Sequence, residues 1–200
     1  MKIVCLASGG VDSSVLMFLL QKKGHKIFPV HINYGQKSAK LELESYNKVC
    51  KFLNLKPIVL DVRGLKEIKS GLTTSKISPI ENPFFPNRNL LFLVIGSSYA
   101  FSKSIKTISV GFLDNSEFSD QNKEFVKKAE ELIKFNLNCD ISLLTPMIDL
   151  DKKEVFNLAK KYNFPLNLTY SCYAGTNPVC GKCHACKDII NASNNNLENT

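Results

Sequence analysis

The sequence lacks the long apolar runs of a membrane protein. Its longest apolar run, residues 90–95, has six residues, whereas a membrane-spanning helix needs about 20. The apolar run after Lys2 is also short, so we expect no signal peptide. Long blocks of like charge are absent too, because the 26 Lys and Arg residues exceed the 18 Asp and Glu residues by eight but are scattered. We therefore expect a cytoplasmic protein whose basic excess favours an anionic ligand without identifying it.

Near the N-terminus, a short apolar run over residues 3–6 leads into Ala7-Ser8-Gly9-Gly10-Val11-Asp12-Ser13-Ser14 and then into an apolar helix. A strand, a small-residue turn and a helix N-terminus form an anion site, because glycines let the backbone approach a ligand that the first helical N–H groups face. Serine hydroxyls add donors, and Asp12 is placed to hold Mg²⁺ on phosphates. The alternative is an ordinary turn in which Asp12 or Ser13 caps the helix.

This loop differs from two better-known phosphate-binding loops. It lacks the Gly-Lys-Ser/Thr ending of a Walker A loop, and it lacks the third glycine of a dinucleotide-binding fingerprint. The anion site that it predicts is therefore of another kind.

Apolar strands and amphipathic helices alternate along the chain. Strands are expected at residues 3–6, 26–32, 57–61, 107–110 and 141–144, with later helices at 38–53, 90–101, 121–135 and 151–162. This order predicts an α/β fold with a doubly wound, parallel, five-stranded sheet. We expect an α/β domain that holds the anion site over residues 1–165, a small C-terminal region over 166–193 and a disordered tail over 194–200. The proline-containing segment 71–86 is expected to be a loop and a candidate lid.

Polar residues follow the expected strands, where ligands of doubly wound sheets bind. Tyr34-Gly35-Gln36 leaves the second strand, so the anionic ligand is expected to bridge it and the loop after the first strand. Arg88, one of only two arginines, opens a helix, where a cation opposes the helix dipole. It either pairs with a nearby acid or faces a phosphate or a substrate carboxylate.

Three acids lie in the loop that follows the fourth expected strand, namely Asp114, Glu117 and Asp120. They could hold magnesium or bind the edge of a cationic ring. They could equally form a solvated turn that caps the next helix.

Four of the seven cysteines are clustered, with the spacing C-x7-C-x2-C-x2-C over Cys172, Cys180, Cys183 and Cys186. Four thiolates can surround one tetrahedral Zn²⁺, so we predict one structural zinc ion per chain. An Fe–S cluster would accept the same ligands, and spacing does not exclude it. His184 is expected to be a bystander. Few aromatic or arginine residues flank the cluster, which argues against nucleic-acid binding there.

Together these stretches resemble one family. The sequence SGGVDSS resembles the pyrophosphate loop of the PP-loop, or N-type, ATP pyrophosphatases. Four further stretches are similar to the Tyr-Gly-Gln, Pro-x-Arg-Asn, Thr-Cys-Tyr and Cys-Gly-x-Cys-x-x-Cys motifs of the 7-cyano-7-deazaguanine synthases, namely Tyr34-Gly35-Gln36, Pro86-Asn87-Arg88-Asn89, Ser171-Cys172-Tyr173 and Cys180-Gly181-Lys182-Cys183-His184-Ala185-Cys186. The resemblance spans residues 1–190.

The resemblance implies an ATP-dependent carbon–nitrogen ligase with an adenine nucleotide alpha hydrolase-like fold. Such an enzyme converts 7-carboxy-7-deazaguanine and ammonia into the nitrile preQ0 through an acyl adenylate and an amide, in queuosine and archaeosine precursor biosynthesis. ATP, Mg²⁺ and a homodimer are implied, without membrane or direct nucleic-acid partners. The implied catalytic residues are Asp12, Ser13 and Arg88. The implied ATP-binding residues are Leu6, Ala7, Ser8, Gly9, Gly10, Val11, Asp12, Ser13, Ser14, Tyr34, Gly35 and Gln36. The implied substrate-binding residues are Arg88, Asn89, Gly111, Glu117 and Asp120.

The chain departs from this family pattern in the expected substrate region. The stretch 115–120 is shorter than the family's Asp-Phe-Ser-Gly-Tyr-Pro-Asp sequence, with Glu117 in place of Asp, and Asn33 stands where the family often has Asp. A paralogue that activates another carboxylate therefore stays open. So do a PP-loop tRNA thiolase and, outside enzymes, a zinc-containing nucleic-acid-binding module.

Overall fold

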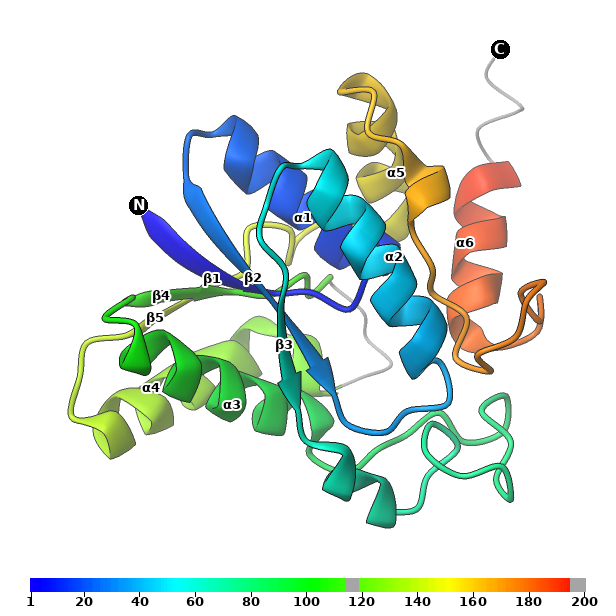
Figure 1. The fold of residues 1–200 in the computed structure, drawn as a ribbon, viewed down its shortest axis with the longest axis horizontal. Coiled ribbons are helices and arrows are strands. Elements are labelled where there is room, and N and C mark those ends of the chain that lie inside the picture. Colours follow the sequence, from blue (N-terminus) through cyan, green and yellow to red (C-terminus); the bar gives the residue numbers. More distant parts are fainter. Residues whose placement is uncertain (114–118, 195–200) are drawn as a thin grey trace.

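Five parallel strands form the centre of the computed structural model, which describes residues 1–113 and 119–194 (Figure 1). The strand order is β3-β2-β1-β4-β5. The strands are β1 (Lys2–Leu6), β2 (Lys26–Asn33), β3 (Ile58–Asp61), β4 (Thr107–Ser109) and β5 (Ser142–Leu144). This confirms the predicted α/β fold with a parallel five-stranded sheet. β1 lies between β2 and β4, and the strand order reverses beside it.

Helices cover both faces of the sheet (Figure 1). One face carries α1 (Val11–Lys22), α2 (Ala39–Phe52), α5 (Lys152–Lys161) and α6 (His184–Asn194), and the other carries α3 (Arg88–Ser102) and α4 (Lys123–Leu137). Side chains of β1 alternate between the two cores. Ile3 and Cys5 pack on the α1 side, while Val4 and Leu6 pack on the α3 side. Because both faces are covered, the central strands are almost continuously apolar.

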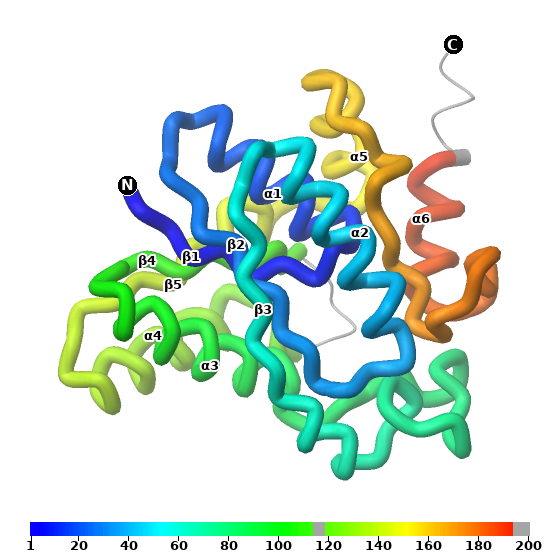
Figure 2. Tube along the Cα trace, viewed as in Figure 1, coloured from blue at the N-terminus to red at the C-terminus, as the bar shows by residue number. Residues whose placement is uncertain are grey.

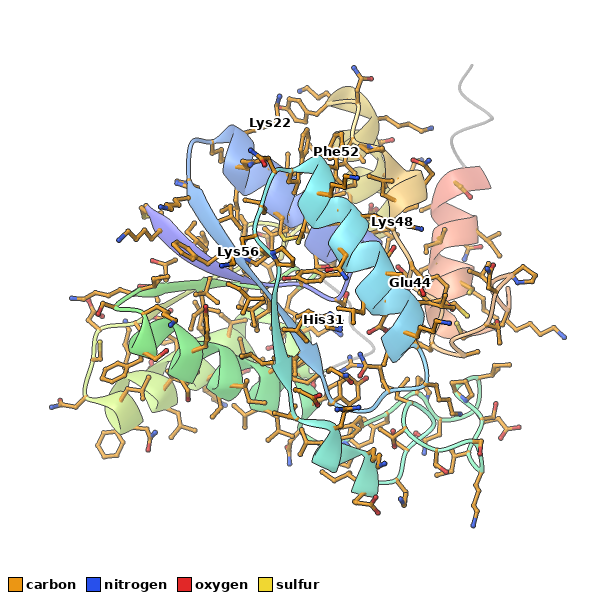
Figure 3. All side chains as sticks on the ribbon, viewed as in Figure 1. Lys22, His31, Glu44, Lys48, Phe52 and Lys56 are labelled. Atoms are coloured by element: carbon orange, nitrogen blue, oxygen red, sulfur yellow. The ribbon has the colours of Figure 1, made fainter. Side chains whose placement is uncertain are left out.

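Helix α2 anchors its face of the sheet through Tyr46. The Tyr46 side chain is fully buried, and its hydroxyl lies 3.0 Å from the carbonyl oxygens of Pro29 and Ile58. The His31 ring lies beneath α2 with its centroid 5.2 Å from that of Tyr46. The outer side of α2 carries Glu44, Lys48 and Phe52, which are exposed to solvent together with the nearby Lys22 and Lys56 of other elements (Figure 3).

Between β3 and α3 the chain forms a short 3₁₀ helix (Arg63–Glu67) and then no regular structure over residues 68–87, as predicted for segment 71–86 (Figure 2). Leu72 and Phe85 are buried, and the Phe85 ring lies 5.4 Å from that of Tyr34. The Lys37 N–H donates to the carbonyl of Leu72 at 2.8 Å. The segment therefore packs against the Tyr-Gly-Gln turn, and its role as a lid stays a prediction.

Helix α6 was missed by the sequence analysis, which described its residues only as part of a metal-binding region. It starts inside the cysteine cluster, packs along α5 and buries Ala192 in the core shared with α1. Cys183 and Cys186 are three residues apart, a spacing that suits a metal site and a helix face equally well. The tail predicted to be disordered lies, from residue 195 on, outside the described residues. None of the described helices has the length and apolar character needed to cross a membrane.

Candidate active site

A cavity of about 390 Å³ opens at the carboxyl ends of β1, β2 and β4. This is the position where the strand order reverses and where doubly wound sheets bind ligands. The loop after β1 and the turn after β2 both line it, as predicted. Arg88 and Asn89 reach it from the start of α3, and Gly111 reaches it from the end of β4. Residues from these four parts of the chain, and from others described below, therefore meet here.

The loop after β1 is held together by its own hydroxyl groups. The N–H of Ser8 donates to Ser13 Oγ at 3.2 Å, and the N–H of Gly10 donates to Ser8 Oγ at the same distance. Gly10 is the N-cap of α1, and neither Asp12 nor Ser13 accepts a capping hydrogen bond from the first N–H groups of that helix. The alternative interpretation, in which Asp12 or Ser13 caps the helix, is therefore wrong.

The N-terminus of α1 offers N–H groups to an anion. The N–H of Val11 donates to Ser171 Oγ at 3.3 Å, and the helical hydrogen bonds begin with Ser14 N–H to Gly10 O. Among the described residues, the N–H groups of Asp12 and Ser13 donate no hydrogen bond. Together with the positive end of the helix dipole, these groups suit a phosphate.

Gly9 shapes this loop without lining the cavity. Its φ is +89°, and a Cβ there would lie 2.5 Å from the carbonyl oxygen of Glu42. Both the backbone conformation and the contact with α2 therefore require glycine.

The cavity includes most of the implied ATP-binding residues but not all of them. Those that line it are Leu6, Ala7, Ser8, Gly10, Asp12, Ser13, Tyr34 and Gln36. Gly9, Val11, Ser14 and Gly35 do not line it.

Glu42 lies on the cavity wall beside the Tyr-Gly-Gln turn, and the sequence analysis missed it. Its Oε2 accepts a hydrogen bond from Gln36 Nε2 at 2.7 Å, and its Oε1 accepts one from Ser38 Oγ at 2.6 Å. Gln36 Oε1 in turn accepts from the N–H of Tyr34 at 3.1 Å. This chain of bonds holds the turn after β2 against α2.

Arg88 is half-buried at the first position of α3 and faces Tyr34 and Tyr173. Burial by itself lowers the pKa of Arg88, but Tyr34, Tyr173 and Asp120 raise it, so the guanidinium stays charged. Burial raises the pKa of both tyrosines, which remain neutral donors. No carboxylate lies within ion-pair distance of Arg88 in the part of the chain that the structure describes. Of the two predicted roles, this arrangement favours binding an anionic ligand.

The remaining implied substrate residues have different positions. Asn89 is buried, and its Nδ2 donates to the carbonyl of Asp120 at 3.3 Å. The Asp120 side chain does not line the cavity, whereas the neighbouring Gln121 does. Glu117 and Asp114 lie outside the described residues. Gly111 packs so closely on α1 that a Cβ would lie 3.2 Å from the N of Ser13.

Lys152 is a cavity residue that the sequence analysis missed. Its Nζ lies 2.7 Å from Asp12 Oδ1 and 2.5 Å from Asp12 Oδ2. The two residues are 140 positions apart, and nothing in the sequence near either one indicates the other. Asp12, the residue predicted to bind Mg²⁺, is therefore paired with a lysine in this structure.

A further wall comes from the segment before α6. The N–H of Tyr170 donates to Gly9 O at 3.0 Å, and Tyr170, Ser171 and Tyr173 line the cavity. His184 and Asp188 of α6 also line it, with His184 Nδ1 3.1 Å from Asp188 Oδ2. The Ser-Cys-Tyr motif was a signal for this wall, but it could not show where the wall would lie.

The four clustered cysteines form a compact set of sulfur atoms. All four Sγ atoms lie within 4.8 Å of one another, and those of Cys180 and Cys186 are 3.9 Å apart. Tetrahedral zinc with Zn–S bonds of 2.3 Å requires sulfur atoms about 3.8 Å apart. Burial opposes ionisation of Cys172, but hydrogen bonds from neighbouring N–H groups, including that of Cys180 at 3.4 Å, lower its pKa to about 6. The set is consistent with zinc and, as predicted, does not include His184.

Known proteins match this chain along almost its whole length. The family described as queuosine biosynthesis protein QueC matches residues 2–196. A Campylobacter jejuni protein named 7-cyano-7-deazaguanine synthase is 34% identical over 203 residues, which cover 92% of this chain and 90% of the relative. A protein of the same name from Methanosphaera stadtmanae is 36% identical over 206 residues, covering 93% and 90%.

Solved structures with lower sequence identity share the fold. A 4-thiouridine synthetase in complex with RNA and ATP superposes with a TM-score of 0.58 at 20% identity, covering 96% of this chain and 50% of that one. An NH3-dependent NAD synthetase from Campylobacter jejuni superposes with a TM-score of 0.55 at 18% identity, covering 85% and 69%. At such identities the likeness is to the fold alone.

Proposed function

The chain belongs to the QueC family of 7-cyano-7-deazaguanine synthases. We propose that this ATP-dependent ligase of preQ0 biosynthesis activates the carboxylate of its substrate in the cavity described above. The observation that carries the proposal is the convergence of an anion-binding helix N-terminus, Asp12 and the Arg88 guanidinium on one cavity. The helix N-terminus suits phosphates, and the Arg88 guanidinium suits an anionic substituent on a ring.

In the first step, a carboxylate oxygen of 7-carboxy-7-deazaguanine attacks the α-phosphorus of ATP. The bond to the bridging oxygen of pyrophosphate breaks, and its electron pair leaves with pyrophosphate. The N–H groups at the start of α1 and the Ser8 and Ser13 hydroxyls bind the departing phosphates. The first product is an acyl adenylate.

Ammonia then displaces AMP and gives the amide. The amide oxygen then attacks the α-phosphorus of a second ATP, and pyrophosphate leaves. That oxygen departs with AMP, and loss of the two nitrogen protons leaves the nitrile. Arg88 holds the carboxylate before attack and offsets charge at the phosphate during it, with neutral Tyr34 and Tyr173 as neighbouring donors.

Two metal ions belong to this proposal. Asp12, a carboxylate on the phosphate loop, is suited to hold Mg²⁺, which neutralises phosphate charge. The four cysteine thiolates are suited to hold Zn²⁺, which ties the segment of Tyr170, Ser171 and Tyr173 in place. Four sulfur ligands would complete the coordination of zinc, so its role would be structural.

Further parts of the proposal concern the whole protein. A homodimer is supported by the exposed Phe101 of α3 and by Leu132 and Phe135 of α4, which are 50%, 54% and 86% exposed. A cytoplasmic location is supported by thiolate ligands, which need a reducing compartment. We also propose that residues 166–193 form a zinc-binding region next to the α/β domain of residues 1–165. Helix α6 of this region packs on α5 of that domain.

The test is mass spectrometry after incubation of the protein with ATP, Mg²⁺, ammonium and 7-carboxy-7-deazaguanine. We expect the nitrile from wild-type protein and no ATP consumption by Asp12→Ala, with the fold of the variant intact by circular dichroism. Full activity of Asp12→Ala would refute the assignment of the loop. If 7-carboxy-7-deazaguanine stays unreacted while the protein still binds ATP, the substrate would instead be another carboxylate.

A further inference from the structure

Lys152 and Asp12 form an ion pair inside the cavity. Both oxygens of Asp12 are within 2.7 Å of Lys152 Nζ, and the two side chains are 22% and 28% exposed. Asp12 lies in the first turn of α1, and Lys152 is the first residue of α5. Both line the cavity. The pair therefore connects the phosphate loop to a helix from the far end of the chain.

Neither helix needs this pair for its own stability. A carboxylate in the first turn of α1 is already favoured by the helix dipole, whereas a lysine at the start of α5 opposes that dipole. α5 has a complete capping box, in which Asp151 accepts from the N–H of Glu154 at 2.7 Å and Glu154 accepts from the N–H of Asp151 at 2.8 Å. A partly exposed ion pair adds little net stability. A local structural role does not account for the lysine.

The balance of charge in the cavity shows what the lysine can do. Among the described residues that line it, Arg88 and Lys152 carry the permanent positive charges, against the carboxylates of Asp12, Glu42, Asp151 and Asp188. Arg88 faces Tyr34 and Tyr173, whereas Lys152 lies directly on the phosphate loop. ATP carries several negative charges on its phosphates. Lys152 is therefore the cation placed to meet them.

We propose that Lys152 is a phosphate-binding residue of this ligase, which pairs with Asp12 when the loop holds no phosphate and turns to a phosphate oxygen when ATP binds. The movement is short, because Asp12 lies in the same loop whose N–H groups face the phosphates. When the α-phosphorus is attacked, the leaving pyrophosphate gains charge, and the ammonium offsets it. Release of the lysine also frees both Asp12 oxygens for Mg²⁺. The inference rests on the proposed assignment of the cavity to ATP.

The test uses inorganic pyrophosphate as the probe, titrated by calorimetry in the presence of EDTA. A charge-assisted hydrogen bond contributes enough to make binding by Lys152→Met about tenfold weaker, while Lys152→Arg recovers much of it. Lys153→Met is the matched control, since Lys153 neighbours Lys152 on α5 and does not line the cavity. It should bind pyrophosphate as the wild type does.

A double variant separates phosphate binding from mere neutralisation of Asp12. If Lys152 only neutralises the carboxylate, Asp12→Asn combined with Lys152→Met restores wild-type pyrophosphate binding. If Lys152 contacts phosphate, the double variant stays weaker than Asp12→Asn alone. Restored binding in the double variant, or unchanged binding by Lys152→Met, would overturn the inference. Failure of the wild type to bind pyrophosphate or ATP would overturn the assignment of the cavity itself.

Discussion

Two walls of the same cavity are built in different ways. The first wall is the loop after β1, residues 7–14, which we call the phosphate loop. It is contiguous in sequence, and the hydrogen bonds of its serine hydroxyls join residues five or fewer positions apart. The second wall, with Tyr170 and Ser171, comes from a segment beside the cysteine cluster and contacts the loop across about 160 positions. The first wall follows from one βα turn. The second depends on the cluster and on the packing of α6, so the two walls should respond differently to mutation.

Loss of a metal ligand should have the largest effect on stability, because the second wall depends on the cysteine cluster. Cys183→Ser removes one of four buried or half-buried sulfur atoms, and we expect loss of bound zinc and a fall of about 4 kcal/mol in the free energy of unfolding, as when a metal site is lost. Metal analysis and urea unfolding measure the two effects. Cys139→Ser, outside the cluster, should keep its metal. Iron in the purified protein, or no metal in well-folded protein, would contradict the structural zinc site.

Gly9→Ala should have the next largest effect, because it strains the contiguous wall. Left-handed backbone costs a side chain about 1–2 kcal/mol, and overpacking against Glu42 O and Tyr46 N adds about 1–3 kcal/mol. The matched control is Gly24→Ala, which has a φ of +79° but open space around its Cβ, so it should lose only the backbone part. Chemical unfolding of both variants measures the difference. Equal losses would show that α2 does not press on the loop.

Ser171→Ala should have the smallest effect, because it removes a single hydrogen bond between the walls. The hydroxyl accepts from the N–H of Val11 in the manner of a helix cap, and losing such an acceptor costs about 1 kcal/mol. Ser193→Ala, at an exposed position of α6, should change stability by less than about 0.5 kcal/mol. In a Cys183→Ser background the Ser171 effect should shrink, since the cluster places that hydroxyl. Full additivity of the two losses would show that the walls are independent.

Most of the fold could be predicted from the sequence. The alternation of strands and helices, the parallel sheet and the irregular segment before α3 follow from apolar periodicity and proline content, which are local signals. α6 was missed because its first turn overlaps the cysteine spacing, which predicted a metal site and concealed a helix.

The residues of the candidate site also fall into two groups, those that the sequence predicted and those that it did not. Three of the predicted elements line the cavity, namely the loop after β1, the Tyr-Gly-Gln turn and Arg88, and the four cysteines cluster. They could be predicted as candidates because their chemistry depends on neighbours in sequence. Glu42, Lys152, Tyr170 and Ser171 were not assigned, because their roles depend on which helix packs beside the loop.

The sequence by itself determined an anion-binding turn and a set of four thiolates, since hydrogen bonds and ligand spacing within a few residues require no distant partner. Only the tertiary structure decided that Lys152 meets Asp12, that Ser171 meets the N–H of Val11 and that α2 leaves room for nothing larger than glycine at Gly9. These contacts join residues that are far apart in the chain. They exist because the strand order places α5, α2 and the cysteine segment around the same end of β1.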